Sequence, residues 1–580
     1  MSSFALVDLG VGPYVNEQVS SRFPVYTRGN AGEVWPEVVY PLSISLTRTF
    51  DDPVSAAMVK TGLVTEAELI EGSGCAAGVF GGYMYLNLSL SRVLAVRSPG
   101  VSIEDNDATY LGSEGIAPAH LPNKADRSVR ASANAVRYMI GVLRTRSLDE
   151  LRADQLMVAE WKRRVPKLIE ASDEELLKTI RSLIPVGMGL FSRHLEVTGK
   201  AGASVQFLSA FCEKQLGDRV VALSLLSSIG DVDSAAPSYA LWALGREVAA
   251  SPDLTKIFDQ GLSGLAERVN QIAHDEFNDK FAMFLDEFGA RGPNEWETAS
   301  ETWGTEPRLA LALIDRLRLA EEKQDPAARS VGLTTQRQGL TASSRARVKW
   351  LLRKPFDRAL AVATLFSAGR ERSKTTVVEL IHVSRVLSRE LAGRAATRTE
   401  DGHWEDMWFC LADELDAYVD DPGPFAERIA ARRATRQALS GRIPPFVFEG
   451  EMPPVMSWPL RSEVQTEDVL AVGDSIKGLA AVPGIAEGRA CVVTDPFDPG
   501  DLGPGDVLIA PLTDPAWTPL FVAAEAVVVD VGGQMSHAVI VAREFGMPCV
   551  VAAADATKRI PHGSRVRVDA TNGTVTLIES

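Results

Sequence analysis

The spacing of apolar and polar residues divides this chain of 580 residues into three parts. Over roughly the first 125 residues, glycine, proline and aromatic residues are frequent and long helical patterns are few, which predicts irregular α+β structure. Between about Ser147 and Leu439, most apolar residues recur at helical spacing. Beyond about residue 478, short β-branched runs are separated by Gly, Pro and Asp. The pattern predicts a multidomain α+β protein in which a mainly helical domain precedes a compact α/β domain.

Start signals locate several helices in the middle part. Ser172 and Glu175 have the spacing of a capping box. Ser251 precedes Pro252, the usual order of an N-cap and a proline in the first helical turn. Another long helix is expected over 374–395. We expect domain boundaries that give an N-terminal part at 1–125, a helical domain at 126–440, a linker at 441–477 and the α/β domain at 478–580.

The last part combines strands with one clear helix. Between 441 and 464 the chain carries five prolines, which predicts a linker that resists collapse. The sequence SHAVIVAREFG has a helical pattern and lies between two of the expected strands. Five strands with a helix indicate a compact α/β domain of roughly a hundred residues. The expected strands begin at Val507, Ala526, Cys549, Arg565 and Thr574.

Composition narrows the function classes. Hydrophobic residues make up 46% and charged residues 23%, so several cores can form and wholesale disorder is excluded. The net charge, 60 Lys+Arg against 76 Asp+Glu or −16, argues against a sequence-independent nucleic-acid partner. No apolar run approaches the ~20 residues of a membrane-spanning helix, and the first residues are a poor signal peptide. Five scattered cysteines without a CxxC pair favour a reducing, cytoplasmic location.

The most informative segment surrounds His537. A buried strand is followed by Gly532 and Gly533, and Ser536 with His537 opens a helix. The free N–H groups and the dipole at a helix N-terminus favour an anion there. An imidazole in that place can act as a nucleophile and carry a transferred phosphoryl group. From spacing alone, a histidine that is simply a polar residue at a helix start remains the alternative.

The sequence GGQMSHAVIVAREFGMP resembles the phosphohistidine motif of the phosphoenolpyruvate (PEP)-utilising enzymes, which include pyruvate phosphate dikinase and rifampicin phosphotransferase. The segments GLAAVPGIAEGRACVV and DPAWTPLF and the closing strand pair agree with it. The resemblance implies a swivelling β/β/α domain in which His537 carries phosphate and Gly532, Gly533 and Ser536 bind it. Met535 stands where dikinase-type members commonly have Thr, which favours the antibiotic-kinase and phenylphosphate-synthase branches.

The resemblance extends into the helical part. TRGNAGEVWPEVVYPLS, at 27–43, is similar to the opening of the drug-binding domain of rifampicin phosphotransferases. EFGARGPNEWETAS, at 287–300, resembles a family segment that usually reads YGHRGPGE, with Ala290 in place of the family histidine. By this resemblance these segments supply four candidate substrate-binding residues: Asn30, Glu33, Arg291 and Glu295.

The sequence RERSK, at 370–374, resembles the RExxK element that lines the acceptor site in this family. On a helix, Arg370 and Lys374 share a face and can hold phosphoryl oxygens, the arginine in bidentate fashion. Glu371 can accept the proton of an acceptor hydroxyl. A solvated helix face with ordinary ion pairs is the alternative that the residues alone leave open.

Other chemistry-bearing residues are less specific. Trp35, Tyr83, Tyr85 and Trp296 either line an aromatic acceptor pocket or belong to the core. The six histidines other than His537 show no zinc-ligand spacing, so no metal is assigned.

The motifs predict one half of a split phosphotransferase. The chain contains no Walker A sequence, and we recognise neither an ATP-grasp domain nor a PEP-binding barrel in it. The resemblance then implies a separate ATP-grasp subunit that uses ATP and Mg²⁺ to phosphorylate His537, as in the divided phenylphosphate synthase. The swivelling domain would pass the group to a hydroxyl of a small organic acceptor. Two alternatives are a PEP synthase-like module and a non-catalytic homologue that binds a ligand or regulates its partner.

Overall fold

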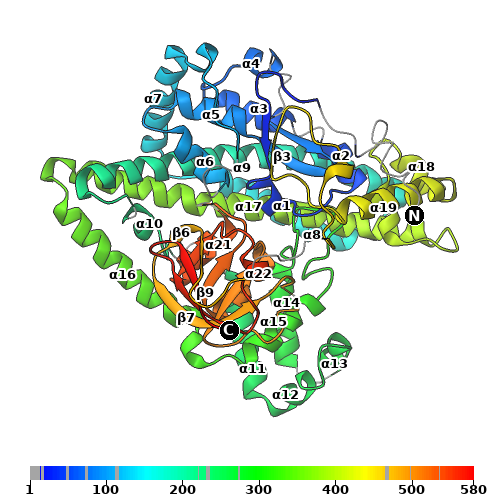
Figure 1. Cartoon of the computed structure of the whole chain (residues 1–580). Coiled ribbons are helices and arrows are strands. Elements are labelled where there is room, and N and C mark those ends of the chain that lie inside the picture. Colours follow the sequence, from blue (N-terminus) through cyan, green and yellow to red (C-terminus); the bar gives the residue numbers. More distant parts are fainter. Residues whose placement is uncertain are drawn as a thin grey trace.

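Two helices of 44 residues form the centre of the molecule. In this computed structural model, α9 (Asp173–Leu216) and α17 (Arg353–Ala396) lie side by side, with the N-terminal part on one side and the C-terminal sheet on the other (Figure 1). The structure describes residues 14, 18–47, 51–71, 76–111, 117–219, 221–229, 236–271, 275–463, 469–496, 498–533 and 536–580.

The N-terminal part is a small sheet surrounded by short helices, which confirms the expected α+β character. The sheet has the order β2-β3-β1-β4. Tyr83 and Tyr85 of β3 are buried, and their hydroxyls donate to the backbone oxygens of Leu439 and Pro445, so both tyrosines belong to the core. The elements are β1 (Val25–Thr27), α1 (Ala31–Val34), α2 (Pro41–Thr47), α3 (Asp51–Lys60), α4 (Glu66–Glu71), β2 (Ala77–Phe80), β3 (Tyr83–Asn87), α5 (Leu88–Arg97) and α6 (Ile103–Leu111).

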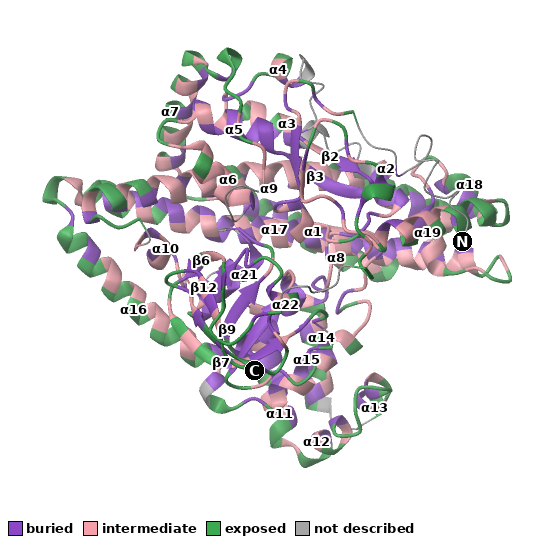
Figure 2. Ribbon diagram, viewed as in Figure 1, coloured by how far each residue is buried: buried purple, intermediate pink, exposed green. Residues whose placement is uncertain are grey.

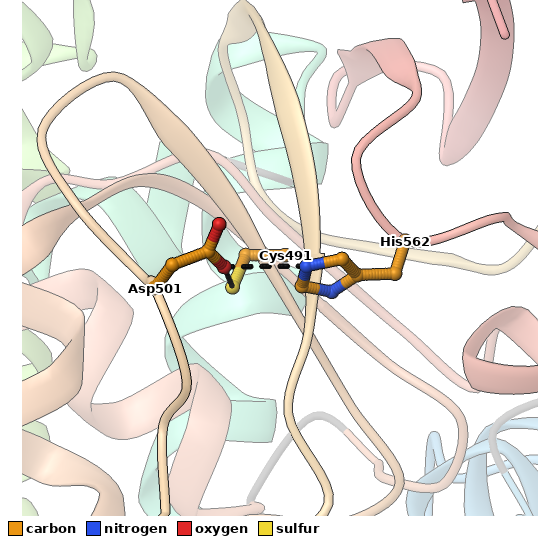
Figure 3. Close-up of side chains that lie close together, drawn as sticks. All are labelled: Cys491, Asp501 and His562. Carbon is orange, nitrogen blue, oxygen red and sulfur yellow. Dashed lines mark hydrogen bonds and ion pairs between the residues drawn. The ribbon is translucent and has the colours of Figure 1, made fainter.

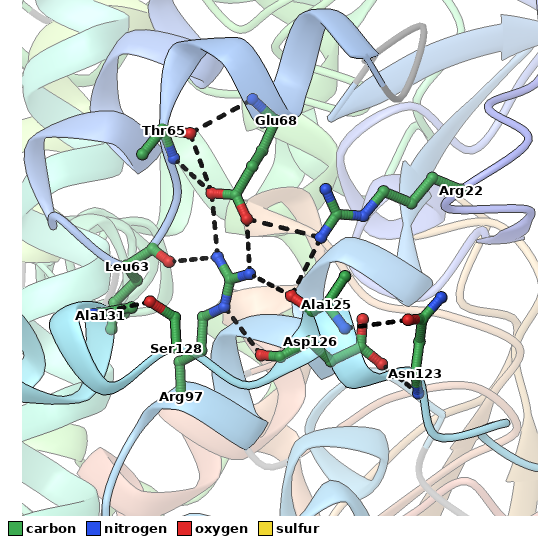
Figure 4. Close-up of polar contacts among 10 residues, drawn as sticks. All are labelled: Arg22, Leu63, Thr65, Glu68, Arg97, Asn123, Ala125, Asp126, Ser128 and Ala131. Carbon is green, nitrogen blue, oxygen red and sulfur yellow. Dashed lines mark hydrogen bonds and ion pairs between the residues drawn. The ribbon is translucent and has the colours of Figure 1, made fainter.

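A buried arginine ties these short helices together. Arg97, at the end of α5, donates to the backbone oxygens of Leu63, Ala125 and Asp126 and pairs with Glu68 at 2.6 Å (Figure 4). A guanidinium can satisfy all these acceptors at once because its five N–H groups point in fixed directions. The network holds α5 against the segments around Leu63, Glu68 and Ala125, and the neighbouring helix α6 reaches toward the C-terminal domain.

The segment that we expected to be a linker takes part in this sheet. Its strand β4 (Val447–Glu449) pairs with β1, and the Trp458 side chain that follows it is buried. The prolines therefore shape a packed connection over this stretch. The next sheet begins with β5 (Ser475–Lys477), slightly before residue 478.

The middle of the chain is helical, as predicted. The side chain of Ser172 accepts a hydrogen bond from the Glu175 N–H at the start of α9, and Ser251 caps the helix that begins at Pro252. The remaining helices are α7 (Val129–Arg144), α8 (Asp149–Leu168), α10 (Val221–Leu225), α11 (Ala236–Ala250), α12 (Pro252–Phe258), α13 (Leu265–Gln271), α14 (Asp275–Phe288), α15 (Arg308–Arg318), α16 (Pro326–Arg347), α18 (Leu415–Asp420) and α19 (Ala426–Ser440). Among the described residues, none of the helices combines the length and apolar character needed to cross a membrane.

The C-terminal domain is an eight-stranded sheet with helices against it, in the order β5-β12-β11-β7-β8-β9-β10-β6. The five expected strands are present, and β7 to β10 pair in parallel. The strands are β6 (Leu479–Val482), β7 (Ile485–Val492), β8 (Asp506–Ala510), β9 (Ala524–Val529), β10 (Cys549–Val551), β11 (Arg565–Asp569) and β12 (Thr574–Glu579). The helices are α20 (Thr518–Ala523), α21 (His537–Phe545) and α22 (Ala556–Arg559).

One face of this sheet shares its core with the helical part. Its central strands β8 and β9 are buried almost throughout (Figure 2), whereas β5, β11 and β12 alternate buried residues with exposed or half-buried ones. Phe521 of α20 and Val541 of α21 belong to one apolar cluster with Leu241 of α11 and Leu313 of α15. The C-terminal domain therefore packs against α11 and α15 through a continuous apolar contact, and this packing turns the start of α21 toward α17.

Candidate functional site

His537 is the first residue of α21, beyond the carboxyl end of the parallel strand β9. Its imidazole is held between two threonines: Nε2 lies 3.1 Å from Thr518 Oγ1 and Nδ1 lies 3.2 Å from Thr513 Oγ1. Burial, and then the positive charges of Lys374 and Arg291, keep the pKa of His537 well below its ordinary value. The ring is therefore neutral at physiological pH, the form that acts as a nucleophile.

The turn before His537 makes a close contact with the N-terminal part. A Cβ atom on Gly533 would lie 2.2 Å from the backbone oxygen of Thr109 in α6, so this approach requires glycine. Gly532 lies beside the Ser536 side chain. Ser536 is the N-cap residue of α21, but its side chain makes no capping hydrogen bond. Met535 lies outside the described residues.

A cavity of about 90 Å³ opens beside the His537 ring. Its lining comes from segments far apart in the sequence, which meet where α21 faces α1, α9 and α17. The lining residues are Glu33, Val34, His194, Asn294, Glu295, Trp296, Arg370, Glu371, Lys374, Thr513, Asp514, Pro515, His537 and Ile540.

The residues of the RERSK sequence face this cavity from α17. Gly369 lets α17 approach Leu148, because a Cβ there would lie 2.3 Å from the leucine Cδ1. Arg370 Nη1 lies 3.3 Å from Glu371 Oε1, and the Glu371 side chain is buried. Lys374 lines the same cavity one helical turn later. The structure thus brings Arg370, Glu371 and Lys374 together with His537; their roles remain predictions.

The segment 287–300 supplies a buried ion pair behind Lys374. Arg291 Nη1 lies 3.1 Å and 3.3 Å from the two carboxylate oxygens of Glu295, and Arg291 Nη2 donates to Thr375 Oγ1 at 2.6 Å. Lys374 Nζ lies 3.4 Å from Glu295 Oε1. Glu295 therefore joins two cations, and it lines the cavity, whereas Arg291 lies behind it.

Glu33 reaches the cavity from α1. Burial raises the pKa of Glu33 to about 7, although the backbone N–H of His537 and the charge of Arg370 act in the opposite direction. Asn30 has a different position: it precedes α1 with a φ of 62° and is not among the residues that line the cavity.

Several residues at the site were not singled out from the sequence. Thr513, Asp514 and Thr518 were missed, although two of them fall in the DPAWTPLF segment that carried the family resemblance. Asp514 Oδ2 accepts the N–H of Asn294 at 3.2 Å, and burial raises the pKa of Asp514 to about 7. His194 lies in a stretch without distinctive motifs, where no sequence signal marked it.

His194 and Trp296 form the apolar wall of the cavity. Their rings lie 6.0 Å apart, and Trp296 also contacts Trp35 at 5.7 Å between ring centroids. His194 Nδ1 lies 3.0 Å from Ser373 Oγ, and burial lowers the pKa of His194 to about 3. This side of the cavity therefore carries no charge at physiological pH.

Cys491, Asp501 and His562 of the C-terminal domain form a second cluster, in which Cys491 is buried and the other two residues are exposed (Figure 3). His562 Nδ1 accepts the N–H of Val492 at 3.2 Å, so Nε2 holds the ring proton and meets Asp501 at 3.2 Å. Burial raises the pKa of the Cys491 thiol to about 12. The Cys491 thiol lies 3.8 Å from Asp501, so the three side chains are paired with one another, and we assign no metal to this cluster.

Two sequence families match the chain. The family described as "Rifampicin phosphotransferase fourth domain" matches residues 193–371, which include Arg370 and Glu371. The family described as "PEP-utilising enzyme, mobile domain" matches residues 502–573, which include His537. The two matched segments supply most of the residues that line the cavity, but Glu33, Val34 and Lys374 lie outside both.

Individual proteins resemble different shares of the chain. An uncharacterized protein of Mycobacterium tuberculosis is 33% identical over 318 residues, which are 54% of this chain and 33% of that protein. The prodigiosin synthesizing transferase PigC of Serratia marcescens is 24% identical over 598 residues, covering 98% of this chain and 65% of PigC. The rifampicin phosphotransferase of Bacillus subtilis is 33% identical over 229 residues, covering 39% and 25%. The chain spans about a third of the length of the mycobacterial relative.

The matched families and these relatives show that the chain is similar to the PEP-utilising enzymes, and to rifampicin phosphotransferase among them.

Proposed function

We propose that this chain carries a phosphoryl group on His537 and transfers it to a hydroxyl of a small organic acceptor. One observation carries the proposal: the His537 ring, at the N-terminus of α21, lines one cavity with Arg370 and Lys374 of α17. A neutral imidazole can hold the group, and the two cations can receive its negative charge. The relatives named rifampicin phosphotransferase support the same class of reaction.

The two cations have separate tasks in this proposal. Arg370 binds two phosphoryl oxygens at once, and Glu371, at 3.3 Å, keeps its guanidinium oriented. Lys374 acts as a point charge and is itself held by Glu295 at 3.4 Å. The first-turn N–H groups of α21, with Gly532, Gly533 and Ser536 beside them, add fixed partial positive charge. Charges fixed before the reaction stabilise the transition state without reorganisation.

The acceptor occupies the cavity in front of these groups. Its apolar wall of His194 and Trp296 suits the carbon skeleton of an organic molecule, and its hydroxyl points toward the phosphoryl group. A carboxylate of the cavity accepts the hydroxyl proton; Glu371 is the residue that the sequence indicates for this step.

In this proposal the phosphoryl group comes from ATP and Mg²⁺ on a separate ATP-grasp subunit. His537, at the start of α21, is buried where this helix faces α17. The C-terminal domain therefore has to swing away from α17 to reach such a donor. The swing separates α20 from α11 and α15, which share a core with it. Apolar contact therefore stabilises the position in which the C-terminal domain docks at the acceptor cavity. Binding of this domain to the donor subunit has to offset the loss of that contact.

Intact-mass measurement tests the proposal. After incubation with ATP, Mg²⁺ and an ATP-grasp partner, we expect the wild-type chain to gain the mass of one phosphoryl group and His537→Ala to gain none. His562→Ala, an exposed histidine of the same domain that does not line the cavity, is the matched control and is expected to label like the wild type. Failure of the wild type to label, or equal labelling of His537→Ala, would contradict the proposal.

A further inference from the structure

Four carboxyl groups line the cavity: Glu33, Glu295, Glu371 and Asp514. Glu371 lies 3.3 Å from Arg370, and Glu295 lies within 3.4 Å of both Arg291 and Lys374. These contacts fix the positions of the cations. Glu371 and Glu295 are therefore suited to orient the cations that hold the phosphoryl group.

Asp514 is engaged in a different way. Its Oδ1 accepts the N–H of Ala516 at 2.9 Å and its Oδ2 accepts the N–H of Asn294 at 3.2 Å. Both oxygens are thus directed at backbone groups that hold two segments together. This position suits a structural carboxyl group.

Glu33 is placed differently from the other three. Its side chain lines the cavity beside the His537 ring. The backbone N–H of His537 and the charges of Arg370 and Lys374 favour its ionised form, and burial opposes them. Ser536 makes no side-chain cap to α21, so an anion at this helix N-terminus meets free N–H groups. A phosphoryl group on His537 engages those N–H groups with the Glu33 carboxylate beside it.

The backbone around Glu33 is fixed firmly enough for such a role. Arg28 Nη2 donates to the backbone oxygens of Trp35 at 3.0 Å and Pro36 at 3.1 Å, which closes the segment that contains α1. The Arg28 guanidinium lies over the Tyr83 ring at 4.5 Å. A Cβ on Gly29 would lie 2.1 Å from the Tyr110 backbone oxygen, so α1 also packs closely on α6. Catalytic groups need this kind of support to stay in place.

We propose that Glu33 is the proton acceptor for the acceptor hydroxyl, which assigns this step to Glu33 in place of Glu371. The inference rests on the proposed function. As the hydroxyl oxygen forms its bond to phosphorus, the bond between phosphorus and the His537 ring nitrogen breaks. The hydroxyl proton passes to Glu33. The released ring nitrogen takes up a proton in turn, so the overall transfer neither gains nor loses protons.

The electrostatic surroundings agree with this assignment. Arg370 and Lys374 face Glu33 from α17, His537 faces it from α21, and His194, Glu295, Glu371 and Asp514 complete the cavity. Burial brings the pKa of Glu33 to about 7 against the opposing cations. A general base works best when its pKa lies near the operating pH.

The test uses chemical phosphorylation and so does not depend on a partner. Wild type, Glu33→Gln, Glu33→Asp, Glu371→Gln and Glu37→Gln are phosphorylated with phosphoramidate. Loss of the phosphoryl group is then followed by intact mass, with water and with phenol as acceptors, between about pH 5 and 9 across the Glu33 titration. Glu37 is the matched control, because it is exposed on the same segment and pairs with Arg436 away from the cavity.

We expect the wild-type rate to rise with pH through about 7, as Glu33 ionises. In Glu33→Gln the rise is lost, and at about pH 8 the rate is on the order of 10²-fold lower. Glu33→Asp restores part of the rise, which a purely structural role would not predict. Glu371→Gln is slower at every pH but keeps the rise, and Glu37→Gln matches the wild type.

The outcomes separate this inference from the proposed function. If His537 labels and Glu33→Gln keeps the wild-type pH profile, or if Glu371→Gln loses it, the assignment to Glu33 is wrong and the phosphotransfer proposal stands. If the wild type never carries phosphate on His537, both are overturned. Should Glu33→Gln fold poorly by circular dichroism, Glu33→Asp decides, because an unchanged pH profile and rate there contradict the inference.

Discussion

The backbone N–H of Asn294 donates a hydrogen bond of 3.2 Å to Oδ2 of Asp514 and thereby joins the helical part to the segment beside His537. Asn294 has a φ of 48°, in the left-handed region that non-glycine residues rarely adopt. Asp514 also caps the short 3₁₀ turn Pro515–Trp517 through the N–H of Ala516. One carboxyl group therefore positions Thr513 and Thr518, the two partners of the His537 ring, against the rest of the cavity.

This carboxyl group makes stability depend on pH. The pKa of Asp514 is raised to about 7 in the folded protein, and an unfolded aspartate titrates near about 3.9. Between these values the folded state binds more protons, so the contribution of Asp514 falls as pH rises. We expect the stability of the wild type relative to Asp514→Asn to fall by on the order of 1 kcal/mol per pH unit between about pH 4 and 7.

Thermal unfolding of the two proteins across this range measures the effect. Comparison with Asp514→Asn removes the contributions of the buried histidines, which both proteins share. Asp498→Asn, at an exposed position of the same domain, is the control. A difference between wild type and Asp514→Asn that stays constant with pH would contradict the assignment of a raised pKa to Asp514.

Local sequence patterns predicted the elements with strong periodicity. Strand β9 has four buried residues in a row before the turn to α21, and Ser172 and Ser251 both cap helices as expected. Strands β5, β6 and β7 were not among the expected strands. Strands β5 and β6 have three and four residues on either side of Gly478, too few for an alternating pattern. Strand β4 was missed because it depends on pairing with β1, and its own sequence lies among prolines.

The candidate site was predictable where a motif carried it. His537 and the 370–374 sequence could be recognised, and the cavity contains them both. The placement of Glu33 beside His537 and the contact of Asn294 with Asp514 could not be predicted, because each joins segments far apart in the chain. Such contacts arise from tertiary packing, and no spacing within one segment encodes them. The same holds for the raised pKa values, which result from burial in a cavity that forms only on folding.

Arg370 and Lys374 of α17 are expected to act when the phosphoryl group passes to the acceptor, and not when His537 is phosphorylated. Arg370→Ala and Lys374→Ala should each slow loss of phosphate to an acceptor by on the order of 10²-fold, because each removes a fixed charge from the transferring group. Labelling of His537 by phosphoramidate should be unchanged. Arg370→Lys should not restore the rate, since an ammonium cannot bind two oxygens in the arginine geometry.

Single-turnover intact-mass kinetics measure both steps in one experiment. Arg372→Ala is the matched control, because Arg372 is on the same helix and does not line the cavity. Equal loss of labelling and of transfer in Arg370→Ala would show that Arg370 supports the fold of the site and not the transfer step.

Gly533 provides a test of whether the C-terminal domain has to dock on the N-terminal part for transfer. In Gly533→Ala the new Cβ would lie 2.2 Å from the backbone oxygen of Thr109, which cannot move without displacing α6. Because the φ of Gly533 lies outside the left-handed region, the C-terminal domain itself should fold normally. We expect faster hydrogen exchange in α6 and at the start of α21. We also expect phosphoryl transfer to be at least about tenfold slower, which corresponds to a loss of about 1.4 kcal/mol from docking.

Gly503→Ala is the control, because a Cβ at Gly503 would lie 3.8 Å or more from other atoms, all within the same domain. A wild-type transfer rate in Gly533→Ala would mean that α21 does not approach α6 this closely when the phosphoryl group leaves His537.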